Sequence, residues 1–195
     1  MRRRENLTTD LTDYLSRLQA CISSLDVAEI RQMLELLITS MENGSRIYIF
    51  GNGGSAATAS HLACDLNKGV GYGRKEKFKV TCLSDNIGIL TAYANDVGYE
   101  SVFVEQIRGI LHPEDLVMGI SGSGNSPNVL AAIAYANECG VTTIGLTGYD
   151  GGKLRKLAKY SCNANINDMQ ISEDVHMILS HLIMATVVKY CSNNI

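Results

Sequence analysis

The sequence contains no tryptophan, only 2 prolines among 195 residues, and no excess of basic side chains. Its formal net charge is −3 and its Lys and Arg residues do not gather on one face, which argues against nucleic acid as the main partner. No apolar run approaches the roughly 20 residues that span a bilayer. The basic start Met1–Arg4 leads into polar residues without the apolar region of a secretory signal. We therefore expect a cytoplasmic protein that acts away from membranes.

The cysteines also lack a pattern. All 6 are scattered singly, without the pair spacing of a metal or redox motif, which is typical of reduced structural thiols. With 46% hydrophobic residues the chain can bury a sizeable core, and it has no internal repeat, low-complexity tract or linker. We expect one domain over residues 1–195, with leading helices in 1–44, a strand and helix core in 45–165 and a last helix in 170–192.

Strands and helices alternate along the chain. Apolar spacings of three and four predict two leading helices, the second with a capping box from Asp26 to Glu29 and a stop at Asn43-Gly44. Short apolar runs predict strands over 46–50, 78–83, 116–120, 141–146 and 160–164. Helical patterns occupy 87–95, 99–110, 129–138, 153–158 and 172–190. This alternation predicts a parallel five-stranded sheet between two helical layers, a three-layer αβα sandwich.

A glycine-rich turn, Gly51–Ala57, follows the first predicted strand and opens a helix. Glycines let backbone N–H groups approach a ligand closely, and a helix N-terminus adds partial positive charge, so this turn favours phosphate. His61 and Asp65 follow on the same helix and, four residues apart, share one of its faces. The segment thus combines an anion site with two reactive groups.

A second polar turn, Ser121–Pro127, follows the third predicted strand, and Ser126 is suited to the N-cap of the next helix. Because the carboxyl ends of parallel strands form the usual ligand crevice, we expect both turns to hold one phosphate. The backbone of Gly122 and Gly124 would contribute N–H groups there. The expected hydroxyl donors are Ser55, Ser121, Ser123 and Ser126.

A dinucleotide site is an alternative, because Gly51, Gly53 and Ala56 satisfy the pattern G-x-G-x-x-A. Such a site needs an acidic residue about 20 positions further on, at the end of the second strand. The acid in that structural place is Asp85, which comes too late, and a dinucleotide leaves the serine-rich turn without a use. A phosphosugar explains both turns better.

Together with Leu146–Gly152 and the pair His176 and His181, these turns resemble the sugar isomerase (SIS) domain family over nearly the whole chain. The resemblance implies a flavodoxin-like fold and a homotetramer with sites at subunit interfaces. It also implies isomerisation of a ketose phosphate to an aldose phosphate through an enediolate. The implied reaction converts sedoheptulose 7-phosphate to D-glycero-D-manno-heptose 7-phosphate, an early step of lipopolysaccharide biosynthesis.

The resemblance assigns catalytic roles to Asp65 and His181. It also implies one Zn²⁺ ion per subunit, held by His61, Asp65, Glu173 and His181, which is a chemically sound zinc set. The implied substrate contacts are Asn52, Gly53, Ser55, Asn95, Asp96, Ser121, Gly122, Ser123, Ser126, Gln170 and Glu173. For Asn95 and Asp96, capping of a helix is an alternative role, whereas His176 is expected to be a core residue.

Three positions depart from the family pattern. Asp65 replaces the usual Glu and is one methylene shorter, Glu173 replaces Gln and adds a negative charge, and Gln170 replaces Asp. Glu173 and His181 lie eight residues apart, about 12 Å along an unbroken helix, so one ion reaches both only if Glu173 bends back or a second subunit contributes. A non-catalytic SIS protein, a phosphosugar sensor or a replication-initiator-associating homologue, is the alternative function. Retention of both His61 and His181 favours an enzyme.

Overall fold

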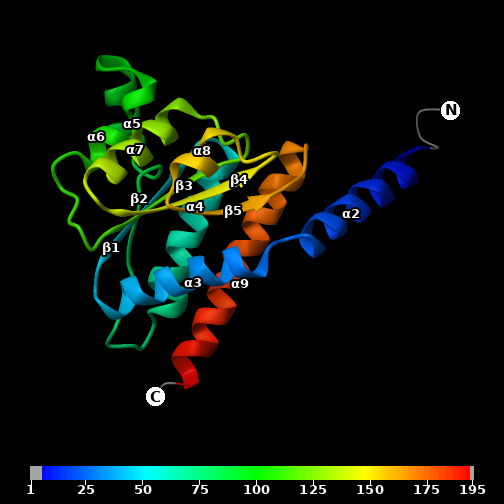
Figure 1. Ribbon diagram of the computed structural model, residues 1–195, viewed down its shortest axis with the longest axis horizontal. Coiled ribbons are helices and arrows are strands. Elements are labelled where there is room, and N and C mark those ends of the chain that lie inside the picture. The colour runs from blue at the N-terminus through cyan, green and yellow to red at the C-terminus, as the bar shows by residue number, and fades with distance from the viewer. Residues whose placement is uncertain (1–5, 194–195) are drawn as a thin grey trace.

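The computed structural model describes residues 6–193 and has a parallel sheet between two helical layers (Figure 1). Its strands are β1 (Arg46–Gly51), β2 (Lys79–Cys82), β3 (Leu116–Ser121), β4 (Thr142–Gly148) and β5 (Tyr160–Ala164). They pair in the order β2-β1-β3-β4-β5, which confirms the predicted flavodoxin-like αβα sandwich. The strand order reverses between β1 and β3, so the ligand crevice of such a sheet lies at their carboxyl ends.

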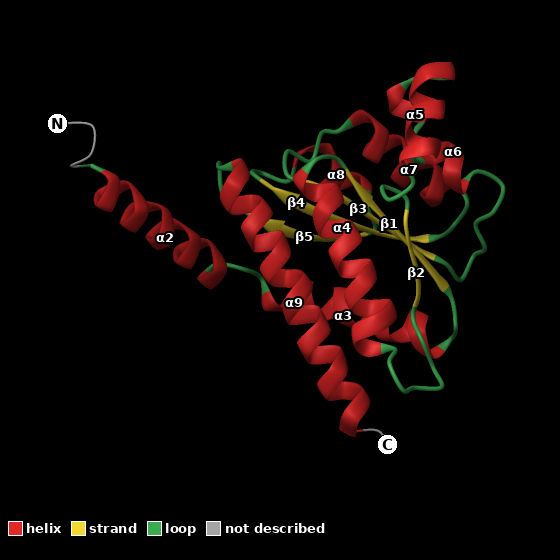
Figure 2. Ribbon diagram, turned by 180° about the vertical axis from the view of Figure 1, so that it is seen from behind, coloured by secondary structure: helices red, strands yellow, loops and turns green. Residues whose placement is uncertain are grey.

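The two helical layers bury separate apolar clusters against the sheet (Figure 2). One face is covered by α3 (Val27–Glu42), α4 (Gly54–Cys64) and α9 (Met169–Asn193). The other is covered by α5 (Ile87–Asp96), α6 (Val104–Ile107), α7 (Pro127–Glu138) and α8 (Gly152–Leu157). The two turns that follow β1 and β3 therefore lead into opposite layers, and they meet at the edge of the sheet between them.

Two predicted helix boundaries were wrong. Residues 99–110 form a 3₁₀ turn, Tyr99–Ser101, and the short α6 rather than one helix. Three consecutive residues are buried, Val102 and Phe103 between the two segments and Val104 at the start of α6, whereas the apolar face of an amphipathic helix returns only every three or four residues. The last helix starts at Met169, before the predicted 172, because the Asp168 carboxylate accepts a hydrogen bond from the backbone N–H of Ile171 and caps the helix.

Helix α4 ends in a π-helix, Asp65–Val70, which the sequence pattern did not predict. Leu66 and Val70 are buried, so the segment is part of the core. A π-helix adds a residue to each turn and occurs frequently at functional sites. This change of helix type begins at Asp65, one of the predicted catalytic residues.

The first helix, α2 (Leu7–Ser23), projects from the rest of the molecule in both views (Figures 1 and 2). Tyr14 and Arg17 in its middle contact Asp174 in the first turns of α9 and Asp168 just before that helix. Its apolar stripe is largely uncovered, since Leu7, Leu11 and Leu15 are 55%, 66% and 63% exposed. This stripe therefore lies outside the core of a single chain. The predicted absence of a signal peptide rests on Met1–Arg4, outside the described residues.

Among the described helices, α9 is long and apolar enough to cross a membrane by length and composition, which corrects the expectation that no segment would pass this test. In the structure its buried side chains pack in the core against both α4 and the sheet. These side chains are Ile171, Val175, Leu179, Ile183 and Val187. The core helix of a globular domain has the same composition. We therefore attribute the apolar character of α9 to packing.

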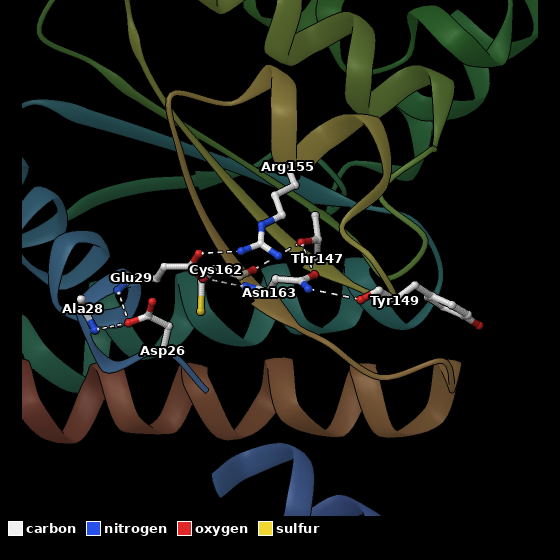
Figure 3. A network of polar contacts seen from close by, with 8 residues as sticks. All are labelled: Asp26, Ala28, Glu29, Thr147, Tyr149, Arg155, Cys162 and Asn163. Atoms are coloured by element: carbon white, nitrogen blue, oxygen red, sulfur yellow. Dashed lines mark hydrogen bonds and ion pairs between the residues drawn. The ribbon is translucent and has the colours of Figure 1, made fainter. Parts of the chain in front are cut away.

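The outer edge of β5 is covered by a side chain of α3 (Figure 3). Glu29 accepts a hydrogen bond from the backbone N–H of Asn163 at 3.3 Å and pairs with Arg155 at 2.9 Å. The predicted capping box is thus only half formed: Asp26 caps the N–H groups of residues 28 and 29, but Glu29 turns to β5 instead. Covering an exposed strand edge in this way prevents it from pairing with another chain.

Candidate active site

The turn after β1 requires its glycines. A Cβ atom on Gly51 would lie 2.7 Å from Ser55 Cβ and 2.9 Å from the carbonyl oxygen of Ile120, so the turn packs directly against β3. Gly53 has φ of +54°, which a residue with a side chain rarely adopts. This compact turn places the buried Ser55 in the first turn of α4, beside the end of the neighbouring strand.

The two turns line one cavity of about 170 Å³. Most of the predicted substrate contacts are among its lining residues, which are Asn52, Ser55, Ile120, Ser121, Gly122, Ser123, Ser126, Met169 and Glu173. Ser126 is the N-cap residue of α7, but its hydroxyl makes no cap bond and lies 3.0 Å from the Ser121 hydroxyl instead. We call Ser55, Ser121, Ser123 and Ser126 the hydroxyl cradle; it suits an anion that is held without a cluster of cations.

A pair of amide side chains, one of them buried, joins the two turns. Asn52 and Asn128 exchange side-chain hydrogen bonds of 2.9 Å in both directions, and the Tyr99 hydroxyl donates to Asn52 at 2.8 Å. Asn128 is 1% exposed and also accepts from the N–H of Val129. Neither Asn128 nor Tyr99 was predicted from the sequence to lie at the site. The signal for Asn128 was an asparagine in the first turn of α7, directly after Pro127, where helix interiors disfavour it.

A second group of polar side chains lies further along α4 and α9. His61 Nε2 is 2.9 Å from His181 Nε2 and 3.2 Å from Asp65 Oδ2. The two imidazole rings meet edge to face with centroids 4.9 Å apart. We call these three residues the His–Asp–His cluster; all three were predicted. They meet because α4, with the π-helix that extends it, packs beside α9.

The cluster fits a metal ion. Its ligand atoms lie within 4.8 Å of one another. Asp65 Oδ2 is buried and accepts no hydrogen bond from any described residue, although a buried carboxylate oxygen without a partner is costly. Two imidazole nitrogens and one carboxylate oxygen match zinc in ligand type, and three protein ligands leave one position open, as in catalytic zinc sites.

Within one chain, Glu173 does not lie in this cluster, so a single subunit does not gather the four-residue set that the resemblance implied. Its carboxylate packs against the backbone of Gly54, so closely that a Cβ atom there would clash with it, and it lines the cavity of the hydroxyl cradle. The reason is the unbroken helix α9, along which eight residues separate Glu173 from His181 by about 12 Å. Glu173 therefore places a negative charge at the N-terminus of α4, where a phosphate would bind.

Four other predicted substrate contacts lie outside the lining of the cavity. Asn95 donates a hydrogen bond to the adjacent Asp96 at 2.7 Å, and both side chains are exposed at the end of α5. Gln170 is exposed in the first turn of α9. Gly53 is the N-cap of α4 and shapes the turn without lining the cavity. Within one chain, these residues are not gathered around the cradle.

His176 is a core residue, as predicted. It is fully buried, and its Nε2 lies 2.9 Å from the carbonyl oxygen of Thr147 at the end of β4. Burial lowers the pKa of His176, although the hydrogen bond to Thr147 acts in the opposite direction. The imidazole is therefore held neutral and ties α9 to the sheet between the cradle and the cluster.

The hydroxyl cradle and the His–Asp–His cluster share the same two helices. Ser55 and His61 are six residues apart on α4, which corresponds to about 9 Å along the helix axis. Glu173 at the cradle and His181 in the cluster have a comparable spacing on α9. A ligand with its phosphate in the cradle must therefore extend along α4 and α9 for its other end to reach the cluster.

The chain is similar to known proteins in sequence and in fold. A family model described as the SIS domain matches residues 11–148. The phosphoheptose isomerase of Helicobacter pylori strain P12 is 37% identical over 173 residues, 88% of this chain and 90% of that protein. The phosphoheptose isomerase of Aquifex aeolicus is 35% identical over 161 residues, with coverages of 82% and 83%. A solved phosphoheptose isomerase structure from Neisseria gonorrhoeae is 30% identical, has a TM-score of 0.83, and covers 94% of this chain and 97% of its own. The chain therefore belongs to the SIS domain family, among its phosphoheptose isomerases.

Proposed function

We propose that this protein is an aldose-ketose isomerase that converts sedoheptulose 7-phosphate to D-glycero-D-manno-heptose 7-phosphate. The observation that carries the proposal is the separation of about 9 Å along α4 between the hydroxyl cradle and the His–Asp–His cluster. A long ketose with a terminal phosphate spans this separation, with its phosphate among the serines and its carbonyl end at the cluster. The names of the relatives, phosphoheptose isomerases, support the same substrate.

The reaction moves protons without a net change in oxidation state. A carbon-bound proton leaves C1 and is returned to C2, while a hydroxyl proton passes from the C1 oxygen to the C2 oxygen through an enediolate. Asp65 is the proposed base for the carbon-bound proton, and His181 is the proposed partner of the oxygens. The cavity residues Ser121 and Ser123 keep the phosphate fixed, so that the same carbon atoms stay at the cluster during both transfers.

His61, Asp65 and His181 are the residues that would hold a zinc ion. When bound, the ion supplies Lewis acidity that stabilises negative charge on the substrate oxygens. His61 and His181 would offer it imidazole nitrogens, and the Asp65 carboxylate would offer the buried Oδ2, which the end of α4 holds 3.2 Å from His61 Nε2. Glu173 remains at the cradle in this proposal.

We further propose that residues 1–195 form a single SIS domain that assembles as a homotetramer in the cytoplasm, with sites at subunit interfaces. The exposed apolar stripe of α2 supports assembly, because Leu7, Leu11 and Leu15 would be buried by a second copy. The exposed Asn95 and Asp96 could reach the site of a neighbouring subunit in such an assembly. The product would supply heptose for cell-surface carbohydrate such as lipopolysaccharide.

Purified protein tests the proposal directly. It should convert sedoheptulose 7-phosphate to an aldose phosphate, measured by NMR of the anomeric protons, and zinc should restore activity after chelation. Fructose 6-phosphate and xylulose 5-phosphate are matched controls with shorter chains, and we expect slower turnover of both. Binding of sedoheptulose 7-phosphate without turnover, with and without zinc, would instead identify a non-catalytic phosphosugar sensor.

A further inference from the structure

Asn67 makes an unusual pair of hydrogen bonds. Its side-chain amide donates to the carbonyl oxygen of Val80 at 2.8 Å, and its side-chain oxygen accepts from the N–H of the same residue at 3.0 Å. Val80 lies in the middle of β2, a terminal strand of the sheet. One side chain thus satisfies both backbone groups of an edge residue, as a neighbouring strand would.

The bonds of Asn67 fix the π-helix. Asn67 is the third residue of this segment, which starts at Asp65 and joins α4 to the loop before β2. On its other side the segment packs against α9, where a Cβ atom on Gly69 would lie 2.5 Å from Met184 Cε. The π-helix is therefore held between α9, which carries His181, and the edge of the sheet.

The position of Asp65 depends on this segment. Its side chain is short, and a preorganised site tolerates displacements of only about 0.5 Å. His61 lies within the regular turns of α4, whereas Asp65 is its C-cap: the backbone N–H of Asp65 still donates to the carbonyl oxygens of His61 and Leu62, but the chain beyond it follows the π-helix. The closest side-chain attachment beyond Asp65 is the pair of bonds from Asn67 to Val80.

We propose that Asn67 is a positioning residue for Asp65: by clamping the π-helix to β2, it fixes the Asp65 carboxylate against the two imidazoles of the His–Asp–His cluster. The inference rests on the proposed function only in treating the cluster as the metal-binding and reacting end of the site. Asn67 itself is exposed and touches neither substrate nor metal in this account. It acts through the backbone of residues 65–67.

The test compares variants that uncover one edge of the sheet or the other. Asn67→Ala removes the clamp on β2, and Asn67→Ser is a milder form of the same change. Glu29→Ala is the matched control, because it removes the side chain that covers the edge of β5, an edge formed by a different strand. Zn²⁺ affinity is measured by competition with a chromophoric chelator, and the absorption bands of bound Co²⁺ report ligand geometry. Melting temperature, kcat and KM are recorded for the same samples.

We expect Asn67→Ala to weaken Zn²⁺ binding by about tenfold or more, as loss of a partner that orients a ligand does. The Co²⁺ bands should shift, and kcat should fall while KM stays within about twofold, because the hydroxyl cradle is intact. Asn67→Ser should show smaller effects of the same kind. Glu29→Ala should lower the melting temperature without changing Zn²⁺ affinity or the Co²⁺ bands.

Unchanged Zn²⁺ affinity and Co²⁺ bands in folded Asn67→Ala would overturn the inference, and so would equal losses in Asn67→Ala and Glu29→Ala. A wild-type protein that binds no Zn²⁺ would also overturn it. The metal measurements need no turnover, so an inactive wild type that binds Zn²⁺ would remove the proposed function and leave the role of Asn67 testable. An active wild type whose Asn67→Ala variant keeps the same Zn²⁺ affinity and Co²⁺ bands would remove the role of Asn67 and leave the proposed function standing.

Discussion

The hydroxyl cradle and the His–Asp–His cluster are built in different ways. The serines of the cradle lie in two turns that follow adjacent strands, and the Ser121 hydroxyl is bonded to that of Ser126. The same two turns are joined by the hydrogen bonds between Asn52 and the buried Asn128. The cluster joins His61 and His181, which lie 120 residues apart, and leaves a buried carboxylate oxygen of Asp65 without a hydrogen bond. A site whose groups satisfy each other holds a ligand in place, whereas unsatisfied groups are available for chemistry.

The largest effect is expected for His181→Ala. Removing this imidazole takes away both a proposed metal ligand and a group that serves the oxygens, so kcat should fall by about 10²–10⁴-fold. Affinity for inorganic phosphate, measured by calorimetry, should stay near the wild-type value, because the cradle is unchanged. Wild-type kcat in this variant would show that the cluster is not the reacting end.

Asp65→Asn should have a slightly smaller effect on kcat, about 10²-fold or more, because the amide keeps the shape of the side chain but is neither a base nor a strong zinc ligand. Steady-state kinetics and a zinc titration measure both consequences. The account predicts that KM changes little. A large rise in KM at constant kcat would place Asp65 among the binding residues instead.

Ser123→Ala tests the hydroxyl cradle instead of the His–Asp–His cluster. A hydrogen bond to a charged group contributes about 1.5–3 kcal/mol, so KM should rise by about 10-fold or more while kcat is preserved. In the same assay, His181→Ala should show the opposite pattern, a lower kcat with little change in KM. If Ser123→Ala lowers kcat and leaves KM unchanged, the cradle does not bind the phosphate.

Glu173→Gln should produce a smaller change of opposite sign. The carboxylate beside Gly54 repels an anion at the cradle, so its neutral replacement should increase the affinity for inorganic phosphate several-fold. Zinc affinity should stay constant, since Glu173 lies outside the cluster. Weaker zinc binding in this variant would return Glu173 to the ligand set that the sequence predicted.

The smallest effect concerns the pH dependence of stability. Burial lowers the pKa of His176 in the folded state, so the unfolded chain binds this proton more readily. The free energy of unfolding should therefore decrease as the pH falls below about 6.5, the ordinary pKa of histidine, and this contribution is fully present above that pH. Urea denaturation at pH 5.5 and 7.5 measures the difference, which His176→Gln should reduce. An equal pH dependence in the wild type and in His176→Gln would show that His176 is not the source of the effect.

The two halves of the site also differ in how far the sequence predicted them. The cradle follows from local patterns, because glycine and serine turns at strand ends are recognisable and parallel strands bring such ends together. His61 and Asp65 were readable as a pair on one helix, but their meeting with His181 was implied by family resemblance and depends on how α4 packs against α9.

Features that arise from packing were not predictable in this way. The π-helix at Asp65 has no local sequence signature, and the break between 101 and 104 follows from burial of consecutive residues under α7. Asn128 stood out only as an asparagine in the first turn of α7, and its hydrogen bonds to Asn52 depend on how the two turns pack together. Glu173 was placed in the metal set by resemblance, and only the continuous helix α9 separates it from His181. At the π-helix and at the break between 101 and 104, tertiary contacts override a helical pattern that is locally adequate.

The central claim is that the His–Asp–His cluster moves a carbon-bound proton of a ketose phosphate held by the cradle. Incubation with sedoheptulose 7-phosphate in D₂O, followed by NMR, tests it most directly. The account predicts that wild-type protein gives aldose phosphate with deuterium at C2 and exchanges one C1 hydrogen of the ketose, whereas Asp65→Asn and His181→Ala bind the substrate without incorporation. Deuterium incorporation at the wild-type rate in both variants would contradict the claim.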